Sequence, residues 1–240
     1  MAARSAGLKA RTVEAGGRPV HLYEGGDGPP LVLLHGMADG KNSFVAAAEP
    51  TEAHRAVRPD MPAHGENARD ISADLSIAGQ VAHVDALVTA PGLDRFALCG
   101  NSMGGHVAAA YAIAHPHRVT ELVLVDAPMA RVVTSPPGVP GPVKDELIRR
   151  ADAGFDTVNA AATAVRDGAG YDLTDRAGGI VAPTLIAWGE EDAVVPREVA
   201  GRHASLVPDA RPLTLPEAGH TPRLERPGEV GRAIAVFLAD

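Results

Sequence analysis

Five consecutive residues carry the most recognisable chemistry in this chain: Gly100, Asn101, Ser102, Met103 and Gly104. They fit Gly-x-Ser-x-Gly, a sharp strand-to-helix turn that exposes its serine as a nucleophile. The glycines suit their places because side chains two residues from the serine would collide with the neighbouring strand and helix. The turn also exposes the N–H of Met103 at a helix N-terminus, where partial positive charge favours an oxyanion. The pattern therefore predicts that Ser102 is a nucleophile and that Gly100, Asn101 and Gly104 support the site.

A serine hydroxyl is a weak nucleophile until a base takes its proton, and the base must be held by an acid. Of the ten histidines, His220 is the expected base, because it lies in the loop after the last predicted strand, where the strand ends gather. Asp192 is the preferred acid, because it also follows a strand and gives the chain order Ser, Asp, His.

Three other carboxylates compete for the role of the acid. Glu190 and Glu191 are adjacent to Asp192, but Asp192 precedes an apolar pair and a proline that should bend the loop inward. Asp126 ends the strand that follows the helix after Ser102, and from there a carboxylate could also reach a histidine. More often such an aspartate caps a turn or anchors a lid, so Asp126 is the minority choice.

A second oxyanion donor is expected in the loop after the strand 31–34. In His35-Gly36-Met37, Gly36 lets the backbone turn, and the N–H of Met37 would point inward. We expect His35 to hold this loop through side-chain hydrogen bonds rather than to act as a base. The loop 60–65 lies at the same edge and is interpreted as a brace for the site, with His64 as an alternative base.

Alternating strands and helices must position these residues. A hairpin is expected over 9–23, and the apolar run 31–34 is typical of a strand buried on both faces. Further strands are expected over 55–59, 95–99, 119–125, 183–189 and 211–215, and helices over 43–48, 77–88, 105–115, 197–205 and 227–238. The alternation predicts an α/β fold, a mostly parallel twisted sheet with helices on both faces.

The chain is expected to form one compact domain with an insertion at one edge of the sheet. Residues 1–126 and 181–240 make up the two parts of the core. Residues 127–180 interrupt the alternation with a proline-rich loop and two short helices, over 143–152 and 155–167, and we interpret them as a short helical lid.

Composition limits the partners of the protein. A formal net charge of -8 without a Lys/Arg run argues against nucleic-acid binding. No run approaches the roughly 20 apolar residues of a membrane span, and the N-terminus lacks the apolar stretch of a signal peptide, so a cytoplasmic protein without a membrane partner is expected. Cys99 is the only cysteine and is expected to be a buried thiol. The sequence has neither metal-ligand spacing nor a Gly-rich phosphate loop, so we expect no metal and no cofactor.

The chain resembles the α/β-hydrolase fold superfamily from about residue 10 to the C-terminus, outside 127–180. The motifs that carry the resemblance are Leu33-Leu34-His35-Gly36, Asp60-Met61-Pro62-Ala63-His64-Gly65, Gly100-Asn101-Ser102-Met103-Gly104-Gly105, Gly189-Glu190-Glu191-Asp192 and Gly219-His220. The resemblance implies a nucleophile, an acid and a base at Ser102, Asp192 and His220, and oxyanion N–H groups from Met37 and Met103. The chain departs from the family at Ala63, where glycine is frequent, and in its short lid.

These observations predict a cofactor-independent serine hydrolase that cleaves an ester-type bond of a small or medium apolar acyl substrate through an acyl-enzyme. The turn around Ser102 is also similar to that of carbon–carbon bond hydrolases. A carbon–carbon bond hydrolase, a thioesterase and a non-hydrolytic lyase or cyclase are therefore alternatives within the same fold. A non-catalytic ligand-binding protein is the alternative from another class, and the intact set of Ser102, Asp192 and His220 argues against it. No feature of the sequence indicates an oligomeric state.

Overall fold

Short apolar runs form a sheet of eight strands in the computed structural model, which describes residues 7–47, 53–67, 72–129 and 172–240. The strands are β1 (Lys9–Ala15), β2 (Arg18–Gly25), β3 (Pro30–Leu34), β4 (Arg55–Pro59), β5 (Phe96–Asn101), β6 (Val119–Val125), β7 (Thr184–Gly189) and β8 (Ala210–Leu215). Their order across the sheet is β1-β2-β4-β3-β5-β6-β7-β8. The first hairpin and the β2–β4 pair are antiparallel, and all the other neighbours are parallel.

The parallel order places the chemistry-bearing residues at one edge of the sheet. Strands β3 to β8 run in one direction, so their carboxyl ends share an edge. The chain enters loops or helices there at His35, Asp60, Ser102, Asp126 and Glu190, directly after β3, β4, β5, β6 and β7. Residues far apart in the sequence can therefore meet at this edge, where open α/β sheets place their sites.

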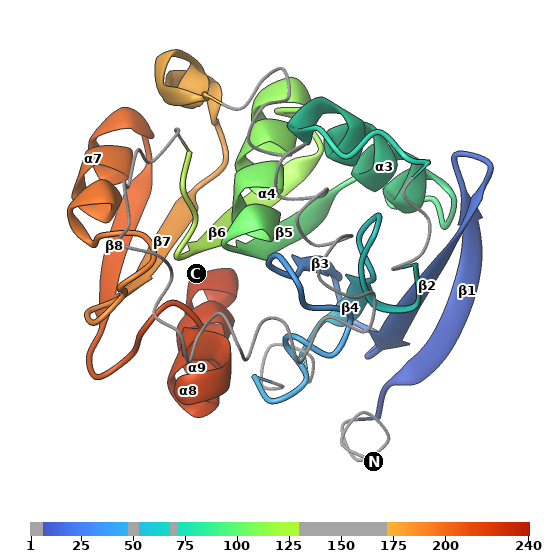
Figure 1. Ribbon diagram of the computed structural model, residues 1–240, viewed down its shortest axis with the longest axis horizontal. Helices are drawn as coiled ribbons and strands as arrows, with labels where there is room; N and C mark the ends of the chain where they lie inside the picture. The colour runs from blue at the N-terminus through green and yellow to red at the C-terminus, as the bar shows by residue number, and fades with distance from the viewer. Residues whose placement is uncertain (1–6, 48–52, 68–71, 130–171) are drawn as a thin grey trace.

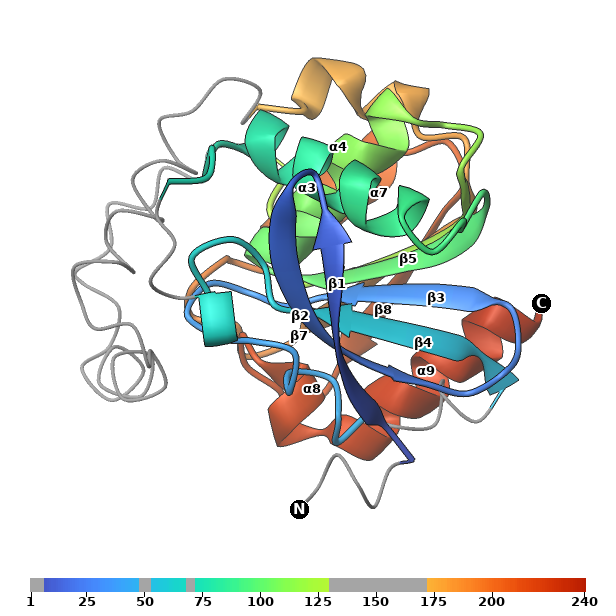
Figure 2. The same cartoon turned by 90° about the vertical axis from the view of Figure 1, so that its right-hand side faces the viewer.

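Helices cover both faces of the sheet (Figures 1 and 2). On one face lie α3 (Ile77–Thr89), α4 (Met103–Ala114) and α7 (Glu198–Leu206), and on the other lie α8 (Pro222–Glu225) and α9 (Pro227–Ala239). Helix α3 begins at an N-cap, where Ser76 Oγ accepts a hydrogen bond from the Gly79 N–H at 3.1 Å. Two short 3₁₀ helices, η1 (Gly65–Asn67) and η2 (Thr174–Gly179), lie in loops. Within the described residues, no helix combines the length and apolarity needed to cross a membrane.

Two hydrophobic cores result, one on each face of the sheet. Alternate strand residues point to opposite faces, so Val32 and Leu34 join the core under α3 and α4, whereas Leu31 and Leu33 join the core under α9. Cys99 lies in the second core and is fully buried, as expected from the sequence. Burial raises the pKa of its thiol to about 12. The apolar runs are therefore central strands that are covered on both faces.

The expected fold class is confirmed, and the predicted strands and four of the predicted helices are present with ends shifted by at most two residues. The helix expected over 43–48 is wrong over the described residues 43–47, which form turns. There the Ser43 N–H donates to Gly40 O, while the Lys41 N–H and the Ser43 hydroxyl donate to the carboxylates of Asp60 and Asp39. The Val45 N–H also donates three residues back, to Asn42 O, so the segment forms successive turns rather than the four-residue hydrogen bonds of an α-helix.

The segment between β6 and β7 is described only at its ends. Most of the expected lid, including the helices expected over 143–152 and 155–167, lies outside the described residues. At the described end, Leu173, Ala177 and Ile180 are buried in the core that contains α4. This end of the segment is therefore packed on the same layer as the helix that follows Ser102.

Candidate active site

The backbone around Ser102 is a strained turn between β5 and α4. Ser102 has φ 51° and ψ -118°, a combination that non-glycine residues rarely adopt and that is retained where the surroundings over-determine it. A β-carbon on Gly100 would collide with the backbone of Gly104, and one on Gly104 would collide with the carbonyl oxygens of Leu34 and His35. The two glycines thus let the strand and helix approach closely enough to force Ser102 out of the regular backbone.

His220 contacts both of its predicted partners. Its Nε2 lies 2.8 Å from Ser102 Oγ, and its Nδ1 lies 2.8 Å from Asp192 Oδ2. The three side chains come from the turn after β5, the loop after β7 and the loop after β8, and 118 residues separate Ser102 from His220. The structure therefore brings together the three residues that the sequence singled out, in the order serine, histidine, aspartate.

The loops that carry Asp192 and His220 are themselves held by hydrogen bonds. Asp192 Oδ1 accepts from the N–H groups of Val194 and Val195 at 2.8 and 2.9 Å, which leaves Oδ2 for His220. Beside His220, the carboxylate of Glu225 accepts from the N–H and the hydroxyl of Thr221 at 3.1 and 2.7 Å. Both loops are thus fixed by local contacts, so that the orientation of the imidazole does not depend on His220 alone.

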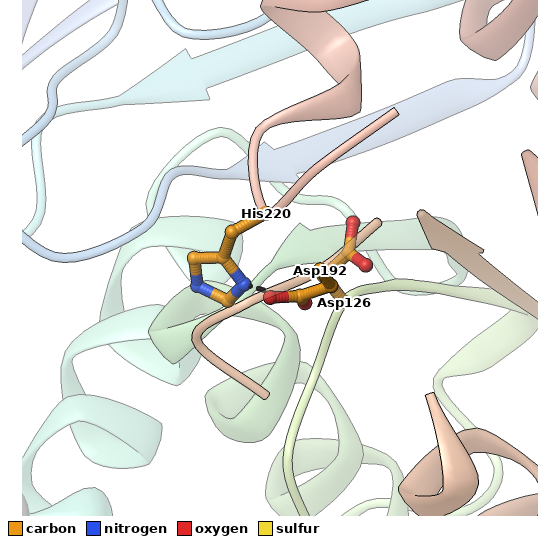
Figure 3. Close-up of side chains that lie close together, drawn as sticks. All are labelled: Asp126, Asp192 and His220. Carbon is orange, nitrogen blue, oxygen red and sulfur yellow. Dashed lines mark hydrogen bonds and ion pairs between the residues drawn. The ribbon is translucent and has the colours of Figure 1, made fainter. Parts of the chain in front are cut away.

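Asp126 lies beside Asp192 and His220, as Figure 3 shows. Each of these three residues offers one potential metal-ligand atom, and the three atoms lie within 4.8 Å of one another. Sequence spacing did not indicate this cluster of three potential metal ligands. Asp126 Oδ1 accepts from the Gly189 N–H at 2.8 Å, and the side chain is completely buried. Burial, with the nearby charge of Asp192, raises the pKa of Asp126 to about 9, so its carboxyl is protonated at neutral pH and can donate to Asp192.

The loop after β3 passes directly beside the nucleophile. A β-carbon at Gly36 would stand 3.1 Å from Asn101 Oδ1 and 3.4 Å from Ser102 Cβ, so only glycine allows this approach without displacement. The next residue is Met37, whose N–H was expected to serve as an oxyanion donor. Met103 begins α4, in the first turn, where backbone N–H groups have no acceptor within the helix.

His35 and His64 brace this loop rather than reach the serine through any hydrogen bond in the described structure. His35 Nε2 accepts from the Met61 N–H at 2.9 Å, and its Nδ1 lies 2.7 Å from Gly36 O, as its predicted supporting role requires. His64 contacts Pro62 O at 2.8 Å and packs against the His35 ring. Burial lowers the pKa of His35 and lowers that of His64 to about 4, so both imidazoles are neutral at pH 7.

A buried arginine is the residue that sequence reasoning missed. Arg223 follows His220 by three residues, and its guanidinium donates to Asp39, Ser43 and Asn101. Its position in the short helix α8 gave no periodic signal, and an arginine after a loop is ordinarily exposed. Asn101 had been expected to support the site, and the contact with Arg223 shows one way in which it is held.

The comparisons with known proteins identify the family of the chain. The sequence profile of the alpha/beta hydrolase fold family matches residues 29–173. The chain is similar to Lipase 1 of Psychrobacter immobilis, with 26% identity over 260 residues that cover 91% of this chain and 80% of that one. It is also similar to 2-hydroxymuconate semialdehyde hydrolase of Pseudomonas putida, with 28% identity over 270 residues that cover 96% of this chain and 94% of that one.

Among solved structures, a membrane phospholipase A described as a bacterial virulence factor superposes with a TM-score of 0.88. Its sequence is 27% identical, and the match covers 99% of this chain and 88% of that one. The family match spans more than half of the chain, and it includes the turn around Ser102. The chain belongs to the alpha/beta hydrolase fold family, and it is a hydrolase.

Proposed function

We propose that this protein is a cofactor-independent serine hydrolase that cleaves an ester-type bond of a small or medium apolar acyl substrate. One observation carries the proposal: the imidazole of His220 contacts Ser102 through Nε2 and Asp192 through Nδ1, at 2.8 Å on each side. This is the contact pattern of a nucleophile, its base and the acid that orients the base. The lipase and phospholipase names among the similar proteins add support for an acyl substrate.

In the proposed reaction, Ser102 Oγ attacks the carbonyl carbon while His220 Nε2 takes the hydroxyl proton. Asp192 holds the imidazole so that the Nδ1–H points at its carboxylate. The carboxylate also stabilises the imidazolium as it forms. The protonated His220 then gives its proton to the leaving alcohol, which leaves an acyl group on Ser102. A water molecule activated by His220 releases the acid and restores the free enzyme.

The negative charge on the carbonyl oxygen needs donors beside Ser102. We assign this role to the N–H groups of Met37 and Met103, because the loop after β3 passes within contact of Ser102 and because α4 begins at Met103. The N-terminus of α4 adds partial positive charge at the same point. Removing one such donor from an enzyme site typically slows kcat by about 10²- to 10³-fold.

The test is ester turnover and fluorophosphonate labelling of the wild type beside Ser102→Ala. We expect the wild type to be labelled and to hydrolyse p-nitrophenyl esters, and Ser102→Ala to lose labelling and about 10⁶-fold in kcat, since alanine has no nucleophile. Ser205→Ala is the matched control, because Ser205 is an exposed serine on α7 whose hydroxyl donates to Arg202 O. A Ser102→Ala protein that turns over esters at the wild-type rate would exclude the proposal.

Carbon–carbon bond hydrolysis is the second candidate. It is favoured by the resemblance along nearly the full chain to 2-hydroxymuconate semialdehyde hydrolase, and by the sequence Gly-Asn-Ser-Met-Gly-Gly around Ser102. Turnover of 2-hydroxymuconate semialdehyde, compared with a series of p-nitrophenyl esters of increasing acyl length, separates the two candidates. Labelling of Ser102 together with cleavage of the semialdehyde and no ester turnover would favour carbon–carbon cleavage.

A further inference from the structure

Arg223 connects three segments of the candidate site that are far apart in the sequence. Its Nη1 donates to Asn101, the residue directly before Ser102. Its Nε and Nη2 donate to Ser43 and Asp39, in the loop after β3. This loop also contains Gly36 and Met37 and is called the oxyanion loop below. Arg223 itself follows His220 by three residues, and the contact with Asp39 spans 184 residues of the chain. One guanidinium thus contacts the residue before the nucleophile and the loop after β3, from a position three residues after the base.

The three acceptors are fixed in turn. Ser43 Oγ donates to Asp39 Oδ2 at 2.9 Å, and the Gly40 N–H donates to Asp39 Oδ1 at 2.9 Å. Asn101 Nδ2 donates to Val125 O at 3.0 Å, which directs its Oδ1 toward Arg223. The group is therefore a closed network in which a shift of one member must displace the others.

The network is buried and contains an ion pair between Arg223 and Asp39. Arg223 is 2% exposed, although its guanidinium is charged. Burial alone would raise the pKa of Asp39, but the charge and the hydrogen bond of Arg223 outweigh it, and the net effect lowers that pKa. Asp39 and Arg223 are thus an ion pair at neutral pH, and a planar guanidinium can reach three acceptors in directions that a lysine ammonium on its flexible stem cannot.

We propose that Arg223 is a positioning residue, which sets the separation between Met37 N–H, Ser102 Oγ and His220 Nε2. This inference rests on the proposed function, because it assigns Arg223 a role in the reaction of that site. The side-chain hydrogen bonds of Arg223 within the described residues go to Asn101, Ser43 and Asp39 rather than to Ser102 or His220, so it acts through Asn101, the oxyanion loop and α8. Its loss should slow the chemical step and leave substrate binding nearly unchanged.

The experiment compares Arg223→Lys and Arg223→Ala with the wild type, using fluorophosphonate labelling rate, kcat and KM for a p-nitrophenyl ester, and the melting temperature. We expect Arg223→Lys to lower kcat and the labelling rate at least about tenfold with KM changed less than about threefold, as for an interaction made only in the transition state. Millimolar guanidinium chloride should restore part of the activity of Arg223→Ala, and sodium chloride at the same ionic strength should not.

Arg226→Lys is the matched control, because Arg226 lies three residues further along, is partly exposed and pairs with Glu217 and Glu229 away from this network. It should keep wild-type kinetics. Ser43→Ala gives a second test should the Arg223 variants fail to fold, since it removes one acceptor without removing a charge. It should lower kcat in the same direction with KM retained.

Two results separate failure of this inference from failure of the proposed function. A wild type that is labelled at Ser102 while Arg223→Lys and Ser43→Ala keep wild-type kcat would overturn the positioning role alone. Loss of activity that follows only the unfolded fraction, without guanidinium rescue, would also overturn it. A wild type without labelling or ester turnover would overturn the proposed function, and the role of Arg223 with it.

Discussion

At the scale of residues, two carboxyls in one buried site have different surroundings. Asp192 accepts hydrogen bonds on both oxygens, from two backbone N–H groups and from His220. Asp126 accepts from the Gly189 N–H on one oxygen, and its other oxygen is buried and can donate to Asp192 only when it carries a proton. The sequence left both residues as candidates for the acid, and these contacts favour Asp192 as the partner of His220.

Exchanging each carboxyl for an amide tests that assignment. Asp192→Asn should lower kcat by about 10⁴-fold, because an amide facing Nδ1 favours the wrong tautomer of His220. Asp126→Asn should change kcat less than about tenfold, since the amide oxygen still accepts from Gly189 and the amide nitrogen donates to Asp192 as the protonated acid does. Steady-state ester hydrolysis measures both variants. A larger loss in Asp126→Asn than in Asp192→Asn would assign the acid to Asp126.

The raised pKa of Asp126 also predicts how stability depends on pH. Because the folded-state pKa of about 9 lies above the ordinary value of 3.8, the unfolded chain releases this proton first as the pH rises. The stabilising contribution is therefore complete below the unfolded pKa and is lost progressively up to the folded pKa. Asp126→Asn has no such proton, so its free energy of unfolding should fall less between about pH 5 and 9.

Urea unfolding of both proteins across this pH range measures the difference. Parallel pH curves for the wild type and Asp126→Asn would show that Asp126 ionises normally in the folded protein.

At the scale of elements, the turn between β5 and α4 works because helix and strands are in backbone contact. A β-carbon on Gly104 would meet the carbonyl oxygens of Leu34 and His35, which are backbone atoms of β3 and the loop after it. Neither can move without disturbing the oxyanion loop or the sheet. The position of Ser102 therefore depends on the packing of β3, β5 and α4, and this packing requires that Gly104 on α4 has no side chain.

Gly104→Ala should destabilise the protein by about 2 kcal/mol or more and abolish labelling of Ser102, because the overpacked helix must shift away from β3. Gly201→Ala on α7 is the matched control, since a β-carbon there meets no atom within 4 Å. Removing glycine from a helix interior should stabilise that variant by about 0.5–1 kcal/mol. Urea unfolding and the labelling rate check both. Normal labelling in Gly104→Ala would contradict the close packing.

At the scale of the whole molecule, Arg58 places a charge in the sheet that no hydrogen bond from the described residues compensates. Arg58 on β4 is 1% exposed, and in the described part of the chain none of its three guanidinium nitrogens has a hydrogen-bond partner. Burial lowers its pKa to about 10. Since the net stability of a domain is only about 5–15 kcal/mol, an unpartnered buried cation is a large cost.

Arg58→Met should therefore raise the free energy of unfolding, by about 1–3 kcal/mol, because methionine fills a similar volume without a charge to desolvate. The midpoint of urea unfolding measures this, and an unchanged slope would confirm that only stability differs. Ester turnover should stay at the wild-type level. A lower midpoint for Arg58→Met would show that the guanidinium contributes more through contacts than its burial costs.

The sequence by itself determined the features that depend on neighbouring residues. The strands follow from apolar runs, the turn at Ser102 from its flanking glycines, and the order of Ser102, Asp192 and His220 from the order of strands and loops. These signals are local, since backbone strain, glycine freedom and hydrophobic periodicity act over a few residues. The local signal failed at the described residues 43–47, which form turns instead of the expected helix, next to the contact of the Lys41 N–H with the distant Asp60.

The tertiary structure alone decided which distant side chains meet. The partners of Arg223 lie 122 to 184 residues away, and no pattern in the sequence connects an arginine after His220 with Asp39, Ser43 and Asn101. The same holds for Asp126, whose pKa depends on its depth beneath the sheet edge and on the carboxylate of Asp192. Such contacts depend on which strands are neighbours and on what each excludes from water, and both are settled only when the whole sheet has formed.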